Sequence, residues 1–168
     1  METDYPKMFA TTAQYTESPW SYMTPPNETD LSTLKNRGAK MIVFHGVADG
    51  VFSPMDTAQW MDKLQANHGN DAGAFTRLFL VPGMNHCSGG PATDQFDMLT
   101  PLVNWVEKGQ APDSVVASVR GPGNAAAVNA DVPATWSATR TRPLCPYPQV
   151  ARYNGTGDIE SAASFSCK

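Results

Sequence analysis

The chain has few charged side chains and no long hydrophobic segment. These two features argue against a nucleic-acid-binding protein and against a membrane-spanning one. Charged residues make up 17% of the 168 residues, and Lys plus Arg total 12 against 16 Asp plus Glu. A net charge of −4 argues against a nucleic-acid partner, because phosphate recognition needs a clustered basic surface. No apolar run approaches the roughly 18 residues that span a bilayer, so we expect no membrane partner. The first twenty residues lack the apolar core of a secretion signal, which predicts that no signal peptide is present.

Cysteine is also scarce, and its positions bear on the cellular compartment. Cys145 and Cys167 lie in polar sequence rich in proline or serine, and we interpret them as a disulfide that closes the C-terminal tail. Such a bond indicates an oxidising compartment and leaves Cys87 without a partner in the chain. The alternative is three reduced cysteines in a cytosolic protein. No metal site is expected, because there is no C-x-x-C pair and the three histidines lack ligand spacing.

Composition divides the chain into three segments of one domain. Hydrophobic residues at 41% in 168 residues are enough for one buried core. Residues 1–38 are rich in Tyr, Thr and Pro and are expected to form an irregular or partly helical lead-in. Residues 39–120 are expected to form an α/β core, and residues 121–168 a loop-rich tail tied by the disulfide.

The segment 39–120 alternates short apolar runs with helical patterns. Residues 40–44 and 75–81 are continuous apolar runs, typical of strands buried on both faces of a parallel sheet. Residues 114–120 are a further candidate strand. The strand–helix–strand–helix order over residues 40–109 predicts the α/β class with flanking helices.

Two helices are expected between and after these runs. The first begins at Ser53 as N-cap, with Pro54 in the first turn and Asp56 closing a capping box, and it ends at Gly69. The second has apolar residues at helical spacing between residues 96 and 106. Pro101 either kinks this helix or lies in the first turn of a shorter helix capped by Thr100, and we favour a kinked or restarted helix.

Two side chains that follow the strands are candidates for catalysis. Asp49 follows the first apolar run and His86 follows the second, and parallel strands bring their C-terminal loops to one edge of the sheet. A carboxylate that fixes an imidazole makes it a general base. Taken singly, Asp49 is more often a turn residue and His86 a hydrogen-bonded loop histidine, but their joint placement favours the catalytic interpretation. Phe52, on the same loop as Asp49, either faces substrate or packs in the core. His45 is interpreted as a buried histidine bonded to loop backbone.

Four motifs in the same order resemble the tannase and feruloyl esterase family, from about residue 27 to the C-terminus. The motifs are FHGVADG at 44–50, VPGMNHCSGGP at 81–91, NWVEKGQAP at 104–112, and TRPLCPYP at 141–148 followed by YNGTGDI at 153–159 and Cys167.

The resemblance implies a serine esterase of the α/β-hydrolase fold, secreted or periplasmic, that cleaves esters of aromatic (phenolic) acids. Asp49 and His86 match the family's catalytic acid and base, and Phe52 matches a position where some members place an aromatic against the substrate. Cys87 matches a cysteine that pairs with one preceding the catalytic serine, and the other two cysteines match a further disulfide. The family's calcium site and lid lie upstream, so no cofactor is expected in this chain.

The nucleophile is missing from the pattern. No serine of the chain stands in a Gly-x-Ser-x-Gly turn, and neither the family's Cys-Ser pair nor its lid has a counterpart here. The chain therefore resembles the C-terminal third of such an enzyme, and the isolated chain is expected to be inactive. The missing N-terminal part is then a candidate partner. The alternatives are a non-catalytic module or pseudo-enzyme that acts by association, and a hydrolase of another ester or peptide class.

Overall fold

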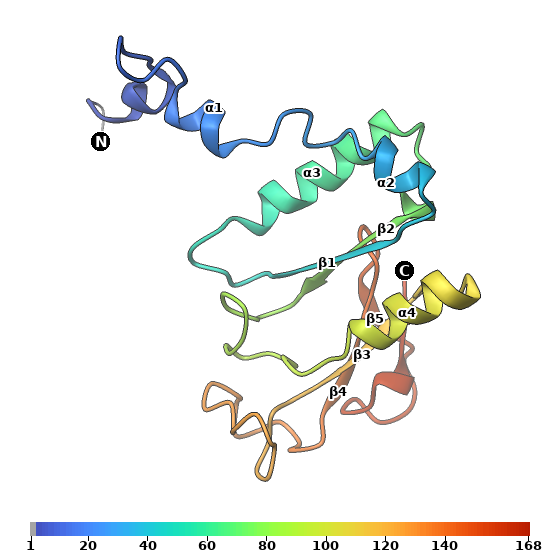
Figure 1. The fold of residues 1–168 in the computed structure, drawn as a ribbon. Helices are drawn as coiled ribbons and strands as arrows, with labels where there is room; N and C mark the ends of the chain where they lie inside the picture. The colour runs from blue at the N-terminus through green and yellow to red at the C-terminus, as the bar shows by residue number, and fades with distance from the viewer. Residues whose placement is uncertain (1–2) are drawn as a thin grey trace.

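The fold is built around two parallel strands with a helix against each face. The computed structural model describes residues 3–168, in which β1 (Met41–Gly46) pairs in parallel with β2 (Thr76–Val81). The connecting helix α3 (Pro54–Asn67) lies on one side of the strands and α4 (Leu99–Lys108) on the other (Figure 1). This arrangement matches the α/β class expected from the alternating apolar runs.

The second strand lies at the centre of the core. Leu78 packs with Met61 and Leu64 of α3, whereas Phe79 and Val81 point into a second cluster on the opposite face. Successive side chains of a strand point to opposite faces, so one apolar run fills both clusters. The expectation of a strand buried on both faces is confirmed for β2.

The same expectation is wrong for β1. Residues Met41 to Val43 are only half-buried, and Phe44 is 45% exposed. Within residues 3–168, β1 pairs with β2 alone, so its other edge has no strand beside it. The edge of β2 is instead covered by the C-terminal tail, where the Tyr147 amide donates to the Leu78 carbonyl at 2.7 Å.

Helix α3 begins and ends where expected but lacks the expected capping box. Ser53 occupies the N-cap position and Pro54 the first turn, yet the Ser53 side chain makes no capping hydrogen bond. The predicted capping box therefore does not form, and the amide of Asp56 bonds to the Ser53 carbonyl at 3.1 Å instead. Gly69 follows the helix with φ of +64°, a left-handed conformation that ends it.

Helix α4 is short, which matches a restarted helix and not a kinked one, but Thr100 is not its cap. It begins at Leu99 and has Pro101 in its first turn, where a missing amide costs nothing. Met98 occupies the N-cap position without a side-chain bond, and Oδ1 of the preceding Asp97 accepts from the amides of Leu99 at 2.8 Å and Thr100 at 3.0 Å. Trp105 of this helix is buried, whereas a stripe of apolar side chains on it is exposed. The α4 stripe consists of Leu99, Val103 and Val106.

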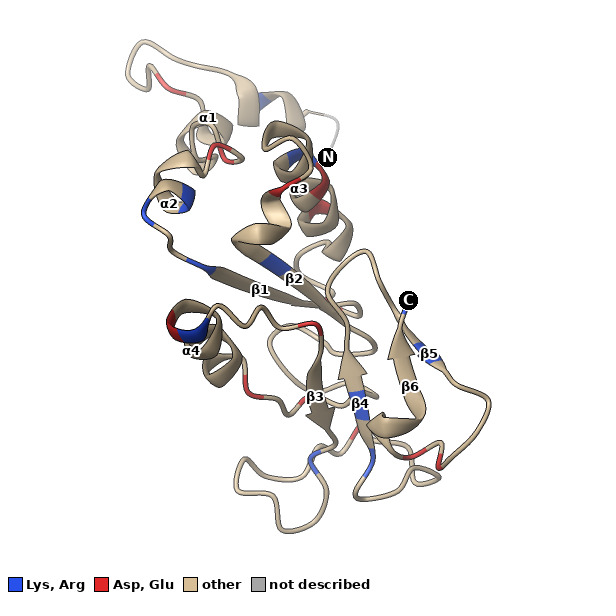
Figure 2. Ribbon diagram, turned by 90° about the vertical axis from the view of Figure 1, so that its right-hand side faces the viewer, with Lys and Arg blue, Asp and Glu red and all other residues tan. Residues whose placement is uncertain are grey.

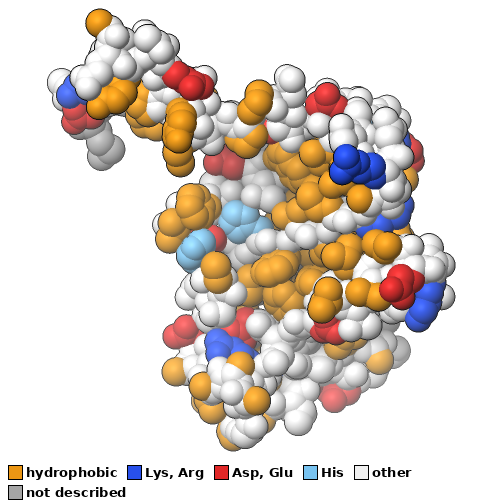
Figure 3. All heavy atoms as spheres, in the orientation of Figure 1, with side chains coloured by type: hydrophobic (Ala, Val, Ile, Leu, Met, Phe, Trp, Pro, Cys, Tyr) orange, Lys and Arg blue, Asp and Glu red, His pale blue; other side chains and the backbone are white. Residues whose placement is uncertain are grey.

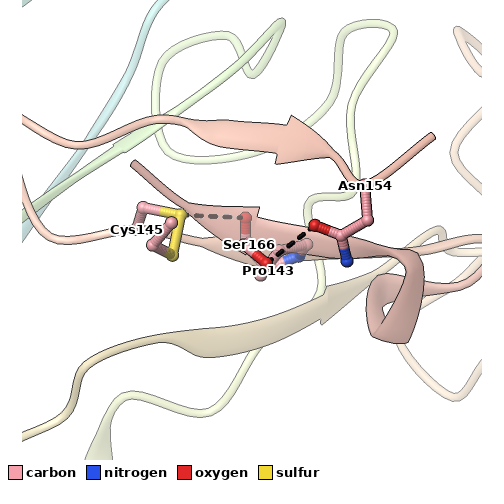
Figure 4. Close-up of a disulfide and its surroundings, with 5 residues drawn as sticks. Pro143, Cys145, Asn154 and Ser166 are labelled. Atoms are coloured by element: carbon pink, nitrogen blue, oxygen red, sulfur yellow. Dashed lines mark hydrogen bonds between the residues drawn. A yellow bond between two sulfur atoms is a disulfide. The ribbon is translucent and has the colours of Figure 1, made fainter.

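The C-terminal part adds two small antiparallel sheets. Strand β3 (Val115–Ser118) pairs with β4 (Thr141–Leu144), and β5 (Ala151–Tyr153) pairs with β6 (Phe165–Cys167) (Figure 2). A disulfide joins Cys145 to Cys167, which confirms the expected pairing (Figure 4).

The first part of the N-terminal lead-in extends away from this body and contains the 3-10 helix η1 (Tyr5–Phe9) and the short helix α1 (Pro19–Met23) (Figure 1). The lead-in reaches the body at α2 (Ser32–Asn36), where Leu31 and Leu34 pack against the cluster that contains Met61. Two further 3-10 turns, η2 (Ala72–Ala74) and η3 (Ala162–Ser164), precede β2 and β6. Across residues 3–168, none of the helices has the length and apolar character needed to cross a bilayer.

Candidate active site

The loops that follow β1 and β2 meet at the C-terminal edge of the parallel pair. The Ala48 amide donates to the carbonyl of Met84 at 2.9 Å, which joins the two loops directly. Gly46 permits this approach, because a Cβ at that position would collide with the carbonyl oxygens of Met84 and Asn85. A glycine at the end of β1 therefore lets the loop carrying Asp49 lie against the loop carrying the histidine.

Asp49 and His86 are brought into hydrogen-bonding contact. Nδ1 of His86 lies 2.9 Å from Oδ2 of Asp49. The Asp49 side chain is 4% exposed, whereas that of His86 is 47% exposed. Within residues 3–168, no atom hydrogen-bonds Nε2 of His86. The buried carboxylate can therefore hold the proton on Nδ1, which leaves Nε2 as a free acceptor, the arrangement of a general base.

The other oxygen of Asp49 is occupied by its own loop. Oδ1 accepts from the amides of Val51 at 2.7 Å and Phe52 at 3.0 Å. The pKa of Asp49 lies well below its ordinary value, chiefly because the Phe52 amide donates to the carboxylate. Burial acts in the opposite direction, and the hydrogen bonds from His86 and Val51 lower the pKa further. The carboxylate is thus ionised wherever His86 could act as a base.

A second histidine contacts the same carboxylate, and the sequence did not reveal this role. Nε2 of His45 lies 3.3 Å from Oδ2 of Asp49 and 3.3 Å from the Phe52 carbonyl, while Nδ1 lies 2.7 Å from the Thr57 hydroxyl. The expected bond to loop backbone is present, but the contact with Asp49 is additional. The sequence feature that could have predicted this contact is the spacing of His45 and Asp49, which are four positions apart. His45 lies near the end of β1, and Asp49 lies on the loop that follows this strand.

The site opens into a hollow of about 410 Å³. Its lining includes His45, Asp49, Phe52, Thr57, Met84, His86 and Cys87. Phe52 is 61% exposed and its ring lies 5.5 Å from that of His86, so it faces the hollow rather than the core. In Figure 3, histidine and hydrophobic side chains gather at this edge, and hydrophobic side chains continue across the face between α3 and α4.

The third cysteine lies beside the histidine. Cys87 is exposed and unpaired, and its φ of +66° is uncommon for a residue other than glycine. The Ser88 amide donates to the His86 carbonyl at 2.9 Å, which makes Cys87 the centre of a tight turn. No group of three or more His, Cys, Asp or Glu residues in the described part of the chain could hold a metal ion.

Curated relatives align with nearly the whole chain. A mono(2-hydroxyethyl) terephthalate hydrolase from Piscinibacter sakaiensis is 52% identical over 161 residues, which are 96% of this chain and 25% of the relative. A probable feruloyl esterase from Arthroderma benhamiae is 34% identical over 168 residues, covering 98% of this chain and 28% of the relative. The chain therefore spans about a quarter of the length of these relatives.

Solved structures share its fold. Feruloyl esterase B from Aspergillus oryzae superposes with a TM-score of 0.66 at 24% identity, covering 83% of this chain and 29% of that one. A tannin acyl hydrolase from Aspergillus niger gives a TM-score of 0.63 at 22% identity, covering 89% and 26% respectively. The family model described as tannase and feruloyl esterase matches residues 8–168. From this match and the two curated relatives, the chain belongs to the tannase and feruloyl esterase family.

Proposed function

We propose that this chain supplies the acid and base of a serine carboxylesterase that acts on esters of aromatic acids. The observation that carries the proposal is the 2.9 Å contact between Asp49 Oδ2 and His86 Nδ1, with Nε2 left facing the hollow. The family and the names of the relatives supply the ester class.

In this mechanism, His86 Nε2 takes the proton of a serine hydroxyl as the hydroxyl oxygen attacks the ester carbonyl carbon. Asp49 stabilises the imidazolium that forms, and the same proton is then given to the departing alcohol. Water hydrolyses the resulting acyl-enzyme with a second pair of proton transfers through His86. The exposed ring of Phe52, 5.5 Å from the His86 ring, is placed to contact the aromatic acid.

The serine belongs to polypeptide outside these 168 residues. Two observations support this part of the proposal: no hydroxyl is hydrogen-bonded to His86 within residues 3–168, and the relatives extend over about four times this length. The open edge of β1, the exposed ring of Phe44 and the α4 stripe form an apolar surface suited to a further strand and its covering layer. Such a strand would add the partner that β1 lacks.

The proposal also includes a cellular location and a position for the family's calcium ion. The Cys145–Cys167 disulfide favours a secreted or periplasmic enzyme, because cytosolic thiols are kept reduced. The calcium ion that the family resemblance implies would be held by the lid, upstream of this chain. Cys87 is exposed at the site and would pair with the cysteine preceding the serine.

A chimera tests the proposal directly. This chain replaces the matching segment of the Piscinibacter sakaiensis relative, to which it is 52% identical, and hydrolysis of mono(2-hydroxyethyl) terephthalate is measured. We expect turnover that falls by at least about 10³-fold in His86→Ala and Asp49→Asn. His68→Ala is the matched control, because His68 packs on Phe75 away from the site. A folded chimera whose rate does not respond to His86 would contradict the proposal.

The same apolar surface supports a second candidate, a module that acts by association rather than catalysis. The isolated chain is expected to show no turnover in either case, so the chimera decides between them. A folded but inactive chimera, together with a stable complex formed through the β1 edge, would favour the module.

A further inference from the structure

The loop that carries His86 is fastened at its far end by two sets of contacts outside the catalytic pair. After His86 the chain turns through Gly89 and Gly90, whose φ angles are +78° and +76°. The Asn85 amide donates to the Gly89 carbonyl at 3.2 Å, which closes the segment into a short loop. Whatever fixes Gly89 and Gly90 therefore also fixes the position from which the His86 ring projects.

The first contact is a buried ion pair. Oδ2 of Asp94 accepts from the Gly89 amide at 2.7 Å and from Nε and Nη2 of Arg120 at 2.9 Å and 2.7 Å. The Asp94 side chain is fully buried, and Arg120 is held in turn by the Ala126 carbonyl at 3.0 Å. Burial alone would raise the pKa of Asp94, but the bonds from Arg120 and Gly89 together hold it below its ordinary value.

The second contact comes from the segment after β3. Oδ2 of Asp131 accepts from the Gly90 amide at 2.9 Å, and the side-chain Nδ2 of the buried Asn129 donates to the Gly90 carbonyl at 2.9 Å. Both backbone groups of Gly90 are therefore bonded to side chains about forty positions further along the chain. We call Asp94, Arg120, Asn129 and Asp131 the loop frame.

The His86 ring has little else to hold it. It is half exposed, and Asp49 is its one hydrogen-bond partner among residues 3–168. Cys87 next to it sits at φ +66°, a conformation that persists only where the surroundings enforce it. Because the His86 ring has a single hydrogen bond, its orientation depends on how the two ends of the loop are anchored.

We propose that Asp94, held by Arg120, is a positioning residue for His86: through the Gly89 amide it fixes the loop so that Nδ1 meets Asp49. This role rests on the proposed function, because positioning matters only if His86 acts as the base. Asp94 does not touch the hollow, so its effect is transmitted through backbone.

The experiment uses the 168-residue chain and needs no turnover. Side-chain ¹H–¹⁵N NMR at pH 8, above the ordinary pKa of histidine, reports which ring nitrogen of His86 carries the proton and how fast that proton exchanges with water. In the wild type we expect the proton on Nδ1, protected by Asp49. In Asp94→Asn we expect mixed tautomers and exchange faster by roughly tenfold, the size expected when one hydrogen bond to a charged group is weakened.

Glu160→Gln is the matched control. It removes the charge from another partly buried Arg–carboxylate pair, Arg140–Glu160 at 2.8 Å, which lies in the C-terminal tail. We expect comparable destabilisation but an unchanged His86 signal. Arg120→Lys should restore much of the signal that Arg120→Met loses, because the lysine keeps a charge beside Asp94. If Asp94→Asn fails to fold, Asp131→Asn provides the second test on Gly90.

The outcomes of these measurements separate the positioning role of Asp94 from the proposed function. A wild-type ring without a protected Nδ1 proton would refute the Asp49 contact and the proposed function with it. A protected proton that is unchanged in folded Asp94→Asn and Asp131→Asn would overturn the positioning role alone. Loss of the signal only together with loss of the fold, in every loop-frame variant, would show that these residues are structural and would also overturn it.

Discussion

The two parallel strands have similar apolar sequences and opposite surroundings. Strand β2 is buried on both faces and its outer edge is bonded to the tail, whereas β1 is half exposed and has an open edge. Phe44 and Phe79 lie opposite each other in the register, yet Phe79 is fully buried and Phe44 is 45% exposed. An apolar run thus indicates that a strand is suited to burial on both faces. For β1, the described residues cover the strand only in part.

The largest expected effect comes from this pair of phenylalanines. Phe79→Ala leaves a cavity in the core and should lower the free energy of unfolding by about 3–5 kcal/mol. Phe44→Ala should lower it by less than about 1 kcal/mol, because much of the ring is already in water and its main contact is Phe96. Urea unfolding with matched m-values measures both. Equal losses would show that β1 is as buried as β2.

A methyl group at the end of β1 should separate the two site loops. In Gly46→Ala the new Cβ meets the carbonyls of Met84 and Asn85, so the backbone must shift at a cost of about 1–3 kcal/mol. We expect the protected Nδ1 proton of His86 to be lost as well. Gly50→Ala is the control, since nothing lies within 4 Å of a Cβ there. A retained His86 signal in Gly46→Ala would show that the loops tolerate the displacement.

Lowering the pH should reduce the free energy of unfolding through Asp49, which follows β1. The pKa of Asp49 is lower in the folded chain than its ordinary value near 3.9, so the folded state binds fewer protons than the unfolded state in acid. Its stabilisation is therefore complete above that ordinary value and is lost as pH falls through the folded pKa. Between pH 6 and pH 3, wild type should lose more unfolding free energy than Asp49→Asn. Parallel pH curves for the two proteins would contradict this.

The smallest effect is expected on the exposed α4 stripe. Val106→Gln should change the free energy of unfolding of this chain by no more than about 0.5 kcal/mol, because the side chain is in water. Trp105→Ala, one position away and buried, should cost several times more. The pair is compared by urea unfolding. A large loss at Val106 would mean that the stripe is already covered, for instance by a second copy of the chain.

Local patterns predicted the parts of the fold that local physics determines. The apolar runs located β1 and β2, and glycine after α3 located its end. Cys145 and Cys167 were paired from their polar surroundings, and Asp49 and His86 were brought together by the rule that parallel strands share one edge. The start of α4 was predicted less well, because the amides of its first turn bond to Asp97 and not to Thr100, the cap considered from the sequence.

The remaining features depend on contacts between distant segments. Strands β4 to β6 are three or four residues long, include Pro143, and lack an alternating pattern, so nothing in the sequence separated them from loop. The loop frame joins Asp94 to Arg120, and it joins Gly90 to a region rich in Gly, Ala and Asn that was expected to be plain loop. The exposure of β1 was missed because its composition matches that of a fully enclosed strand.

The shared carboxylate oxygen of Asp49 has a consequence for the charge that the site can hold. His45 and His86 approach Oδ2 at 3.3 Å and 2.9 Å, so a single negative charge faces two rings. That charge can balance one imidazolium, which in the proposed mechanism is the one formed on His86. Thr57, whose hydroxyl lies 2.7 Å from Nδ1 of His45, holds the ring that shares the oxygen with His86.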